Sequence, residues 1–381
     1  MTIDVAPHLF SPIKVGDLEL KHRIVMGPLT RSRSPKEVAN TLNAEYYGQR
    51  ATDGGLLISE GTSPSLTAAG YPNVPGILTE EQSKGWKLST AAVHAKGGYI
   101  YAQLWHTGRA GKSEFQPDKK APVSASAIPI DGKETPRALD LDEIKYVVNE
   151  FQTSAKWARE AGFDGIEIHA AHGYLIDQFL QTSSNKRDDH YGGSIENRAR
   201  FLFEVVDAVL KELPASKVAI RLSPWLGIQN VSDEDPETLF KYVLVKLNAY
   251  KLAYIHLTEP VWGGWQQGPP HSQSKLQILR PLITSPTKLL LTGGYTLETG
   301  EEAVAAGRAD IIGYGRPFIT NPDLVERFRL GKPLTDYSDP SKYYGGGREG
   351  YADYLTWEEE EQRKEKKEKL IPGSGATHSK Y

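Results

Sequence analysis

The sequence predicts an α/β fold: a closed (β/α)8 TIM barrel that forms a single domain with loop insertions. Three observations support this prediction. The chain has 381 residues, which exceeds the roughly 250 residues typical of such barrels and leaves room for inserted loops. It contains eight short apolar runs rich in Ile, Leu and Val, as expected for parallel strands that are covered by helices. Helical stretches lie between these runs, and eight βα units in unbroken succession favour closure over an open doubly wound sheet.

The predicted strands and helices alternate along the chain. The strands are expected at residues 24–28, 55–60, 99–104, 165–170, 218–223, 253–257, 288–292 and 310–315. The clearest helix spans residues 194–213, where apolar side chains recur at helical spacing from Phe201 to Leu213 and Ser194 is a suitable N-cap. Other helices are predicted at residues 80–96, 142–161, 234–248 and 298–307.

The remaining length is assigned to two segments outside the regular barrel. Residues 107–140 are rich in Pro, Lys and Ser and are predicted to form an inserted loop. Residues 358–381 contain a run of charges followed by a Gly/Ser-containing end, which is typical of a solvated helix and a frayed, flexible tail. The barrel domain itself is therefore expected to occupy residues 1–357.

Composition excludes several classes of protein. The formal net charge of −3 gives no electrostatic basis for binding nucleic acid or an anionic membrane. The chain has no cysteine, which excludes disulfides, thiolate nucleophiles and cysteine metal ligands. It shows neither a signal peptide nor an apolar run long enough to span a bilayer. We therefore expect a cytoplasmic protein, a monomer or homodimer, whose partners are small molecules.

Glycine and arginine residues after the last two predicted strands indicate a phosphate site. Barrel enzymes carry their active sites at the carboxyl ends of the strands, and often bind phosphate after strands seven and eight. Gly293 and Gly294 let backbone N–H groups approach an anion, and Arg316, which follows Gly315, adds a guanidinium fork. Two structural turns and a structural ion pair are the alternative, but the combination at these positions favours phosphate binding.

The stretch HAAHGYL places His169, His172 and Tyr174 at the carboxyl end of the fourth predicted strand. Two imidazoles can hold one oxygen atom and polarise a carbonyl group, and a tyrosine with an ordinary pKa of about 10 can donate a proton. The same histidines could be ligands in a metal-dependent TIM-barrel hydrolase, although no neighbouring strand visibly supplies a third ligand. They could also be satisfied core side chains. We assign no metal and keep the hydrolase as the alternative function.

The chain resembles the Old Yellow Enzyme family of FMN-dependent ene-reductases, which includes the 12-oxophytodienoate reductases of plants. The likeness covers residues 8 to 357. It rests on the long block DGIEIHAAHGYLIDQFLQTSSNKRDDHYGGSIENRARF and on LFSPIKVGDLELKHRIVMGPLTR, AQLWHTGR, LLTGGYT and GYGRPFITNPDL. The resemblance implies an NADPH dehydrogenase that holds FMN tightly but non-covalently across the barrel mouth. NADPH is expected as the hydride donor, with NADH left open.

The resemblance also implies roles for individual residues. FMN would be bound by Pro28, Thr30, Gly61, Gln103, Arg221, Gly293, Gly294, Gly315, Arg316 and Tyr344, with Tyr343 beside the last of these. The substrate would be bound by His169, His172, Tyr174 and Tyr71. The two histidines would hold the carbonyl oxygen of an α,β-unsaturated substrate, and Tyr174 would donate the proton that completes a ping-pong reduction by NAD(P)H. Some members have His-x-x-Asn where this chain has His-x-x-His, so the resemblance does not fix the enone.

Overall fold

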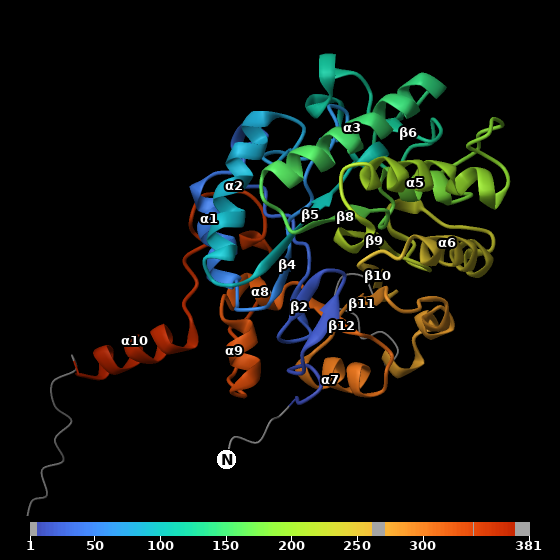
Figure 1. The fold of residues 1–381 in the computed structure, drawn as a ribbon. Helices are drawn as coiled ribbons and strands as arrows, with labels where there is room; N and C mark the ends of the chain where they lie inside the picture. Colours follow the sequence, from blue (N-terminus) through green and yellow to red (C-terminus); the bar gives the residue numbers. More distant parts are fainter. Residues whose placement is uncertain (1–5, 261–270, 338, 370–381) are drawn as a thin grey trace, which may run out of the picture.

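A computed structural model of the protein describes residues 6–260, 271–337 and 339–369 (Figure 1). Eight parallel strands close into a barrel in the order β10-β11-β12-β3-β4-β5-β8-β9, which confirms the predicted (β/α)8 fold. The barrel strands are β3 (Ile24–Met26), β4 (Leu56–Ile58), β5 (Tyr99–Leu104), β8 (Gly165–His169), β9 (Val218–Leu222), β10 (Tyr254–Thr258), β11 (Lys288–Thr292) and β12 (Ile311–Tyr314). Each of them coincides with one of the predicted apolar runs.

Helices surround the barrel and bury an apolar layer against its outer face (Figure 1). Five of them match the predicted helices within a few residues: α2 (Glu80–His94), α3 (Leu141–Glu160), α5 (Ile195–Leu210), α6 (Pro236–Tyr250) and α7 (Leu297–Ala305). The Ser194 side chain accepts a hydrogen bond from the Asn197 amide, which confirms the predicted N-cap of α5. Four further helices were not predicted: α1 (Thr41–Arg50), α4 (Leu175–Leu180), α8 (Pro317–Thr320) and α9 (Leu324–Arg329).

A short hairpin covers the amino-terminal end of the barrel. It consists of β1 (Ile13–Val15) and β2 (Leu18–Leu20), paired antiparallel. Its apolar side chains join the cluster inside the barrel, and its turn residue Gly16 lies against Ser216 and Ala253, just before β9 and β10. Because this end is covered, the carboxyl ends of the strands are the end of the barrel available for a site.

The inserted segment and the carboxyl-terminal helix lie outside the βα repeat. Residues 107–140 contain short 3-10 helices (Gly108–Ala110, Ser113–Phe115 and Pro117–Lys119) and a two-stranded sheet of β6 (Val123–Ser124) and β7 (Arg137–Ala138). Helix α10 (Trp357–Lys369) projects from the body (Figure 1) and is held at its start by the ion pair between Arg327 and Glu360, 2.9 Å apart. The predicted tail begins within α10, and its residues 370–381 lie outside the described part of the chain.

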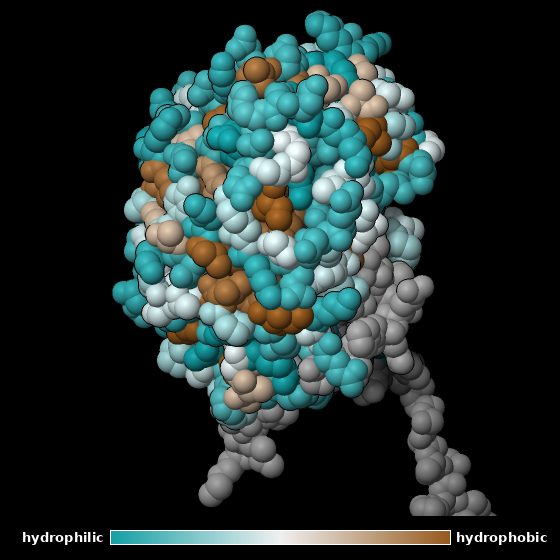
Figure 2. Space-filling view, turned by 90° about the vertical axis from the view of Figure 1, so that its right-hand side faces the viewer, coloured by the Kyte–Doolittle hydropathy of each residue, from teal (hydrophilic) through white to brown (hydrophobic). Residues whose placement is uncertain are grey.

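The outer surface is largely polar on the face that carries α5 and α6 (Figure 2). On this face, hydrophilic residues dominate and apolar residues form small, separate groups (Figure 2). Within the described ranges, no helix combines the length and apolar character needed to cross a membrane.

Candidate active site

Apart from Tyr343 and Tyr344, the predicted site residues lie on or after seven of the eight barrel strands, at the end opposite the hairpin. Gln103, His169 and Arg221 lie near the carboxyl ends of β5, β8 and β9. The others follow a strand: Pro28 and Thr30 after β3, Gly61 and Tyr71 after β4, His172 and Tyr174 after β8, Gly293 and Gly294 after β11, and Gly315 and Arg316 after β12. The closed parallel barrel therefore gathers residues that are nearly 300 positions apart in the sequence around one mouth.

Aromatic side chains form a compact cluster around His169. The ring centroids of His172 and Tyr174 lie 5.3 and 5.1 Å from that of His169, and both rings stand nearly perpendicular to it. Trp105 contacts Tyr174 edge to face at 4.9 Å, and Tyr71 stacks on Trp105 at 5.6 Å. The structure thus brings the four predicted substrate residues together and adds Trp105, which the sequence analysis did not assign to the site.

Both histidines of this cluster are held neutral. Burial lowers the pKa of His169 and of His172 well below the usual value, and the positive charge of Arg221 lowers both further. The His169 Nδ1 atom accepts a hydrogen bond from the Ala171 amide at 3.3 Å. A neutral imidazole that accepts at Nδ1 carries its proton on Nε2, so His169 can donate a hydrogen bond to a substrate from that atom.

His172 is fixed by its backbone as well as by its ring. Its φ of 60° is in the left-handed region, which is uncommon for a residue other than glycine. The His172 amide donates to Ser223 Oγ at 2.7 Å, and its ring atom Nε2 lies 3.2 Å from Thr258 Oγ1. These contacts hold the second imidazole against the first.

Tyr174 remains a protonated phenol. Burial raises its pKa well above the ordinary value, and the neighbouring Tyr71 and Tyr344 add to this rise. Gln229 interacts with the hydroxyl and has the opposite, smaller effect. The side chain therefore keeps its proton throughout the neutral range and can act as an acid.

A chain of polar side chains crosses the barrel interior next to this cluster. Gln103 Nε2 donates to Glu167 Oε1 at 2.7 Å, and Glu167 Oε2 lies 2.9 Å from His256 Nδ1. The other ring nitrogen of His256 lies 2.8 Å from Thr292 Oγ1, which also accepts from Arg221 Nη2 at 3.4 Å. The predicted residues Gln103 and Arg221 are thus connected through three side chains that the sequence analysis did not identify.

The ends of β11 and β12 form a backbone cradle. Gly293 and Gly294 have φ values of 123° and 77°, which side-chain-bearing residues rarely adopt. A Cβ atom on Gly293 would also lie only 2.7 Å from the Cβ of Glu259. Since Thr292 pairs with Gly313 in the neighbouring strand, Gly315 and Arg316 lie beside this cradle. The arrangement places the exposed backbone of Gly294 and residue Arg316 after neighbouring strands, which are the two features on which the predicted phosphate site depends.

Tyr343 and Tyr344 belong to a loop that arginine side chains hold in place. Arg31 donates from Nε to the Tyr343 carbonyl at 2.8 Å, and Arg33 donates from Nε to the Gly347 carbonyl at 3.0 Å. The two tyrosine rings are 6.2 Å apart, and Tyr344 is 64% exposed. Among the predicted site residues, Tyr344 and Gly294 are exposed, whereas the others are buried or half-buried.

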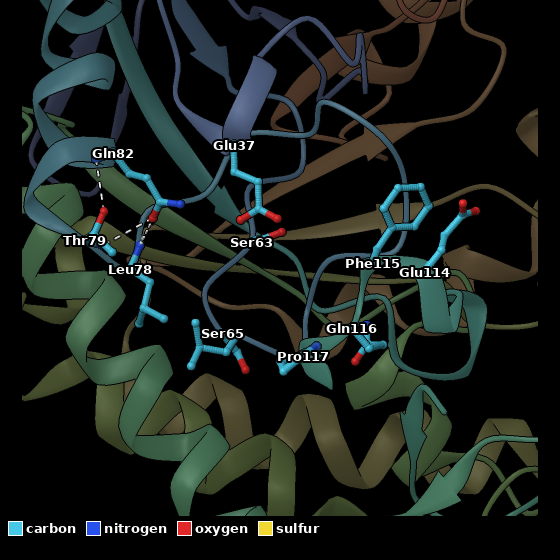
Figure 3. A pocket seen from close by; sticks show the side chains of 11 residues that line it. Glu37, Ser63, Ser65, Leu78, Thr79, Gln82, Glu114, Phe115, Gln116 and Pro117 are labelled. Atoms are coloured by element: carbon cyan, nitrogen blue, oxygen red, sulfur yellow. Dashed lines mark hydrogen bonds between the residues drawn. The ribbon is translucent and has the colours of Figure 1, made fainter. Parts of the chain in front are cut away.

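A separate cavity of about 280 Å³ lies between the start of α2 and the inserted segment (Figure 3). The side chains of Glu37, Ser63, Gln82 and Phe115 are among those that line it. None of the predicted site residues contributes to its wall. This cavity is thus distinct from the cluster around His169.

Comparison with known proteins identifies the family. Residues 8–335 match the NADH:flavin oxidoreductase / NADH oxidase family. The chain belongs to this family. It is 45% identical over 360 residues to putative 12-oxophytodienoate reductase 11 of Oryza sativa subsp. japonica, covering 91% of this chain and 96% of the relative. It is 44% identical over 361 residues to 12-oxophytodienoate reductase 2 of Arabidopsis thaliana, covering 92% and 96%.

Solved structures agree with this assignment. Morphinone reductase superposes with a TM-score of 0.87 at 43% identity, over 94% of this chain and 98% of that one. A structure of morphinone reductase in complex with tetrahydroNAD gives a TM-score of 0.84 at the same identity, over 91% and 97%. The predicted Old Yellow Enzyme membership is confirmed, and with it the prediction of a flavin oxidoreductase of the ene-reductase type.

Proposed function

We propose that the protein is an FMN-dependent ene-reductase that uses NAD(P)H to reduce the activated C=C bond of α,β-unsaturated carbonyl compounds. The observation that carries this proposal is the cluster of two neutral imidazoles and one protonated phenol at the barrel mouth. The relatives are named as reductases of 12-oxophytodienoate and of morphinone, which supports a substrate with a carbonyl group.

The donor set at the barrel mouth fits FMN. Gly294 leaves its backbone uncovered where a phosphate would lie, since nothing lies within 4 Å of a Cβ atom built on it, and Arg316 supplies a positive charge. Gln103 and Arg221 offer an amide and a guanidinium for the polar end of the flavin ring, with Pro28, Thr30, Gly61 and Tyr344 around it. When bound, FMN supplies the hydride chemistry that links a nicotinamide donor to the alkene.

The two histidines act on the carbonyl group of the substrate. Hydrogen bonds from His169 and His172 to the carbonyl oxygen draw electron density toward that oxygen and make the β-carbon electrophilic. Because both imidazoles are neutral, they donate hydrogen bonds without protonating the oxygen. Donors of this kind contribute roughly 10²- to 10³-fold in rate, since they stabilise the charge that develops in the transition state.

Tyr174 completes the reduction by donating its proton to the α-carbon. Its ring lies against His169 and Trp105, so the proton comes from the same cluster of side chains that holds the carbonyl group. Trp105 packs against both His169 and Tyr174, and Tyr71 stacks on Trp105. A site lined by these rings has a lower local dielectric than water, which strengthens the hydrogen bonds inside it. In this reaction the nicotinamide and the enone occupy the site in turn, which is a ping-pong sequence.

The test is the visible spectrum of the purified protein, kept anaerobic, before and after NADPH and then cyclohexenone. We expect a flavin band that bleaches with NADPH and returns with the enone, and parallel titrations with NADH give the nicotinamide preference. A protein that binds no FMN, or that holds a functional metal ion, would contradict the proposal and favour the hydrolase alternative. In the described ranges, no group of three or more potential ligands is arranged to hold a metal ion.

A further inference from the structure

Two fully buried polar side chains, Glu167 on β8 and His256 on β10, meet inside the barrel. Neither has any exposed surface. Strand β9 lies between their strands, yet Glu167 Oε2 and His256 Nδ1 are only 2.9 Å apart. Both side chains must therefore point inward and bond across the inner face of β9, on which Arg221 is carried.

The carboxylate sets the direction of every hydrogen bond in the chain that connects Gln103 with Arg221. An ionised carboxylate only accepts, so Gln103 must turn Nε2 toward Glu167, as it does at 2.7 Å. The amide oxygen Oε1 is then directed away from Glu167, and within the described ranges no group donates to it. His256 must likewise donate from Nδ1, which leaves Nε2 to accept from the Thr292 hydroxyl at 2.8 Å.

The same carboxylate balances the charge of Arg221. Burial alone would raise the pKa of Glu167, but the hydrogen bonds from His256 and Gln103 and the positive charge of Arg221 outweigh burial and hold the pKa below its usual range. Burial lowers the pKa of His256 to about 4, so the imidazole is neutral, and it lowers the pKa of Arg221 to about 10, so the guanidinium stays charged. The network thus contains one negative and one positive charge.

We infer that Glu167 is a positioning residue that sets both the affinity for FMN and its midpoint potential. It holds the Gln103 amide so that Oε1 can accept a hydrogen bond from the imide N–H of the flavin ring. If the amide flipped, Gln103 Nε2 would face this imide N–H, and two donors would oppose each other. Its negative charge also offsets part of the Arg221 charge and thereby makes reduction of FMN less favourable. This inference rests on the proposed flavin function. His256 and Thr292 continue this chain of hydrogen bonds from Glu167 to Arg221 and thereby hold the Arg221 side chain in place.

A purely structural glutamate–histidine pair would behave differently when the charge is removed. In the wild type, Gln103 Nε2 and His256 Nδ1 both donate to the Glu167 carboxylate. Glu167→Gln keeps the shape of the side chain and one accepting oxygen, but it replaces the other oxygen with an N–H2 group that faces one of these donors. Either Gln103 must flip or His256 must change tautomer. A structural role predicts a change in stability alone, whereas positioning predicts changes in the bound cofactor.

The experiment compares four proteins: the wild type, E167Q, T292V and the control E150Q. Each is stripped of FMN to measure its Kd by fluorescence titration, and the holoenzyme is used for the midpoint potential and Tm. Thr292→Val keeps both charges but removes the hydroxyl that links His256 to Arg221. Glu150 is a buried glutamate on α3 that bonds to Ser65 and Leu66, outside the network.

We expect E167Q to raise the Kd for FMN roughly 3- to 10-fold, the effect of one misdirected hydrogen bond. It should also shift the equilibrium toward reduced FMN on the order of tenfold, or about 30 mV for a two-electron couple. T292V should raise the Kd with a smaller shift in potential, because both charges remain. E150Q should change neither quantity, although it lowers Tm.

The outcomes are separable. A wild-type protein that binds no FMN contradicts the proposed function itself. If the wild type binds FMN but E167Q matches it in Kd and potential and differs only in Tm, the pair is structural and the inference is overturned. If E167Q does not fold, T292V decides: a raised Kd supports the inference and an unchanged Kd overturns it.

Discussion

Replacing Tyr174 with phenylalanine removes the proposed proton donor and leaves the aromatic ring in place. The ring centroid lies 5.1 Å from that of His169 and 4.9 Å from that of Trp105, and phenylalanine can keep both contacts. Because burial holds the pKa of Tyr174 well above its ordinary value, the wild-type phenol is protonated at neutral pH. The substitution therefore removes one transferable proton and little else.

The size of the effect follows from the other groups in the cluster. A positioned general acid contributes roughly 10²- to 10⁴-fold in rate. Neither His169 nor His172 can replace it, because burial lowers the pKa of each and keeps both rings neutral. The Tyr71 hydroxyl interacts with that of Tyr174. Tyr71 can therefore replace Tyr174 in part, which moves the expected loss in rate toward the lower end of this range. We expect Y174F to slow the enone half-reaction on the order of 10²-fold.

The assay is anaerobic stopped-flow absorbance of each half-reaction. Reduction of the flavin by NADPH should be nearly unchanged in Y174F, while reoxidation by cyclohexenone should be slow. In the wild type, the enone half-reaction should not decline as the pH rises toward the ordinary tyrosine pKa of about 10. An equal loss in both half-reactions, or none in either, would refute the assignment of Tyr174 as the acid.

Other predictions concern the remaining parts of the site and the fold. His169→Ala should slow the enone half-reaction roughly 10²- to 10³-fold in the same assay, and an unaltered rate would count against its role as a donor. Gly293→Ala should raise the Kd for FMN roughly 5- to 150-fold, the cost of a strained backbone position, and titration of the apoprotein checks this. The pKa of the buried Glu60 is raised by burial to about 7, above its unfolded value, so the wild type loses stability as pH rises from about 4.5 to about 7. Glu60→Gln should therefore gain stability relative to the wild type over that interval, by at most about 3 kcal/mol, and a pH-independent difference in chemical denaturation would contradict this. Treatment with EDTA should leave the enone activity intact, and a loss that a divalent metal restores would contradict the assignment of no metal to the site.

The barrel could be predicted because each of its strands is an apolar run that helices cover from outside. The elements that the sequence analysis missed have no such signature. Helix α1 carries Asn, Gln, Tyr and Gly in one short segment and is specified by the capping box of Asn40 and Asn43 and by packing on α2. Strands β1 and β2 are three residues each, too short for a period to appear.

The proposed catalytic residues were accessible from the sequence because they stand together after one strand, but the supporting network was not. Glu167 lies two residues before His169, and His256 lies two residues before Thr258, so each pair faces the same side of its strand. Polar residues at alternate positions of an otherwise apolar strand were the available signal. That β8 and β10 meet across β9 depends on closure and tilt of the barrel, which no local pattern encodes.

In the proposed reaction the enone is reduced at its C=C bond while the histidines hold its carbonyl oxygen. The most direct measurement supplies nicotinamide deuterated at C4 and locates the deuterium in the cyclohexenone product by NMR. We expect cyclohexanone with one deuterium at the β-carbon and a solvent-derived hydrogen at the α-carbon. Deuterium on the carbonyl carbon of an alcohol, or at the α-carbon, would contradict it.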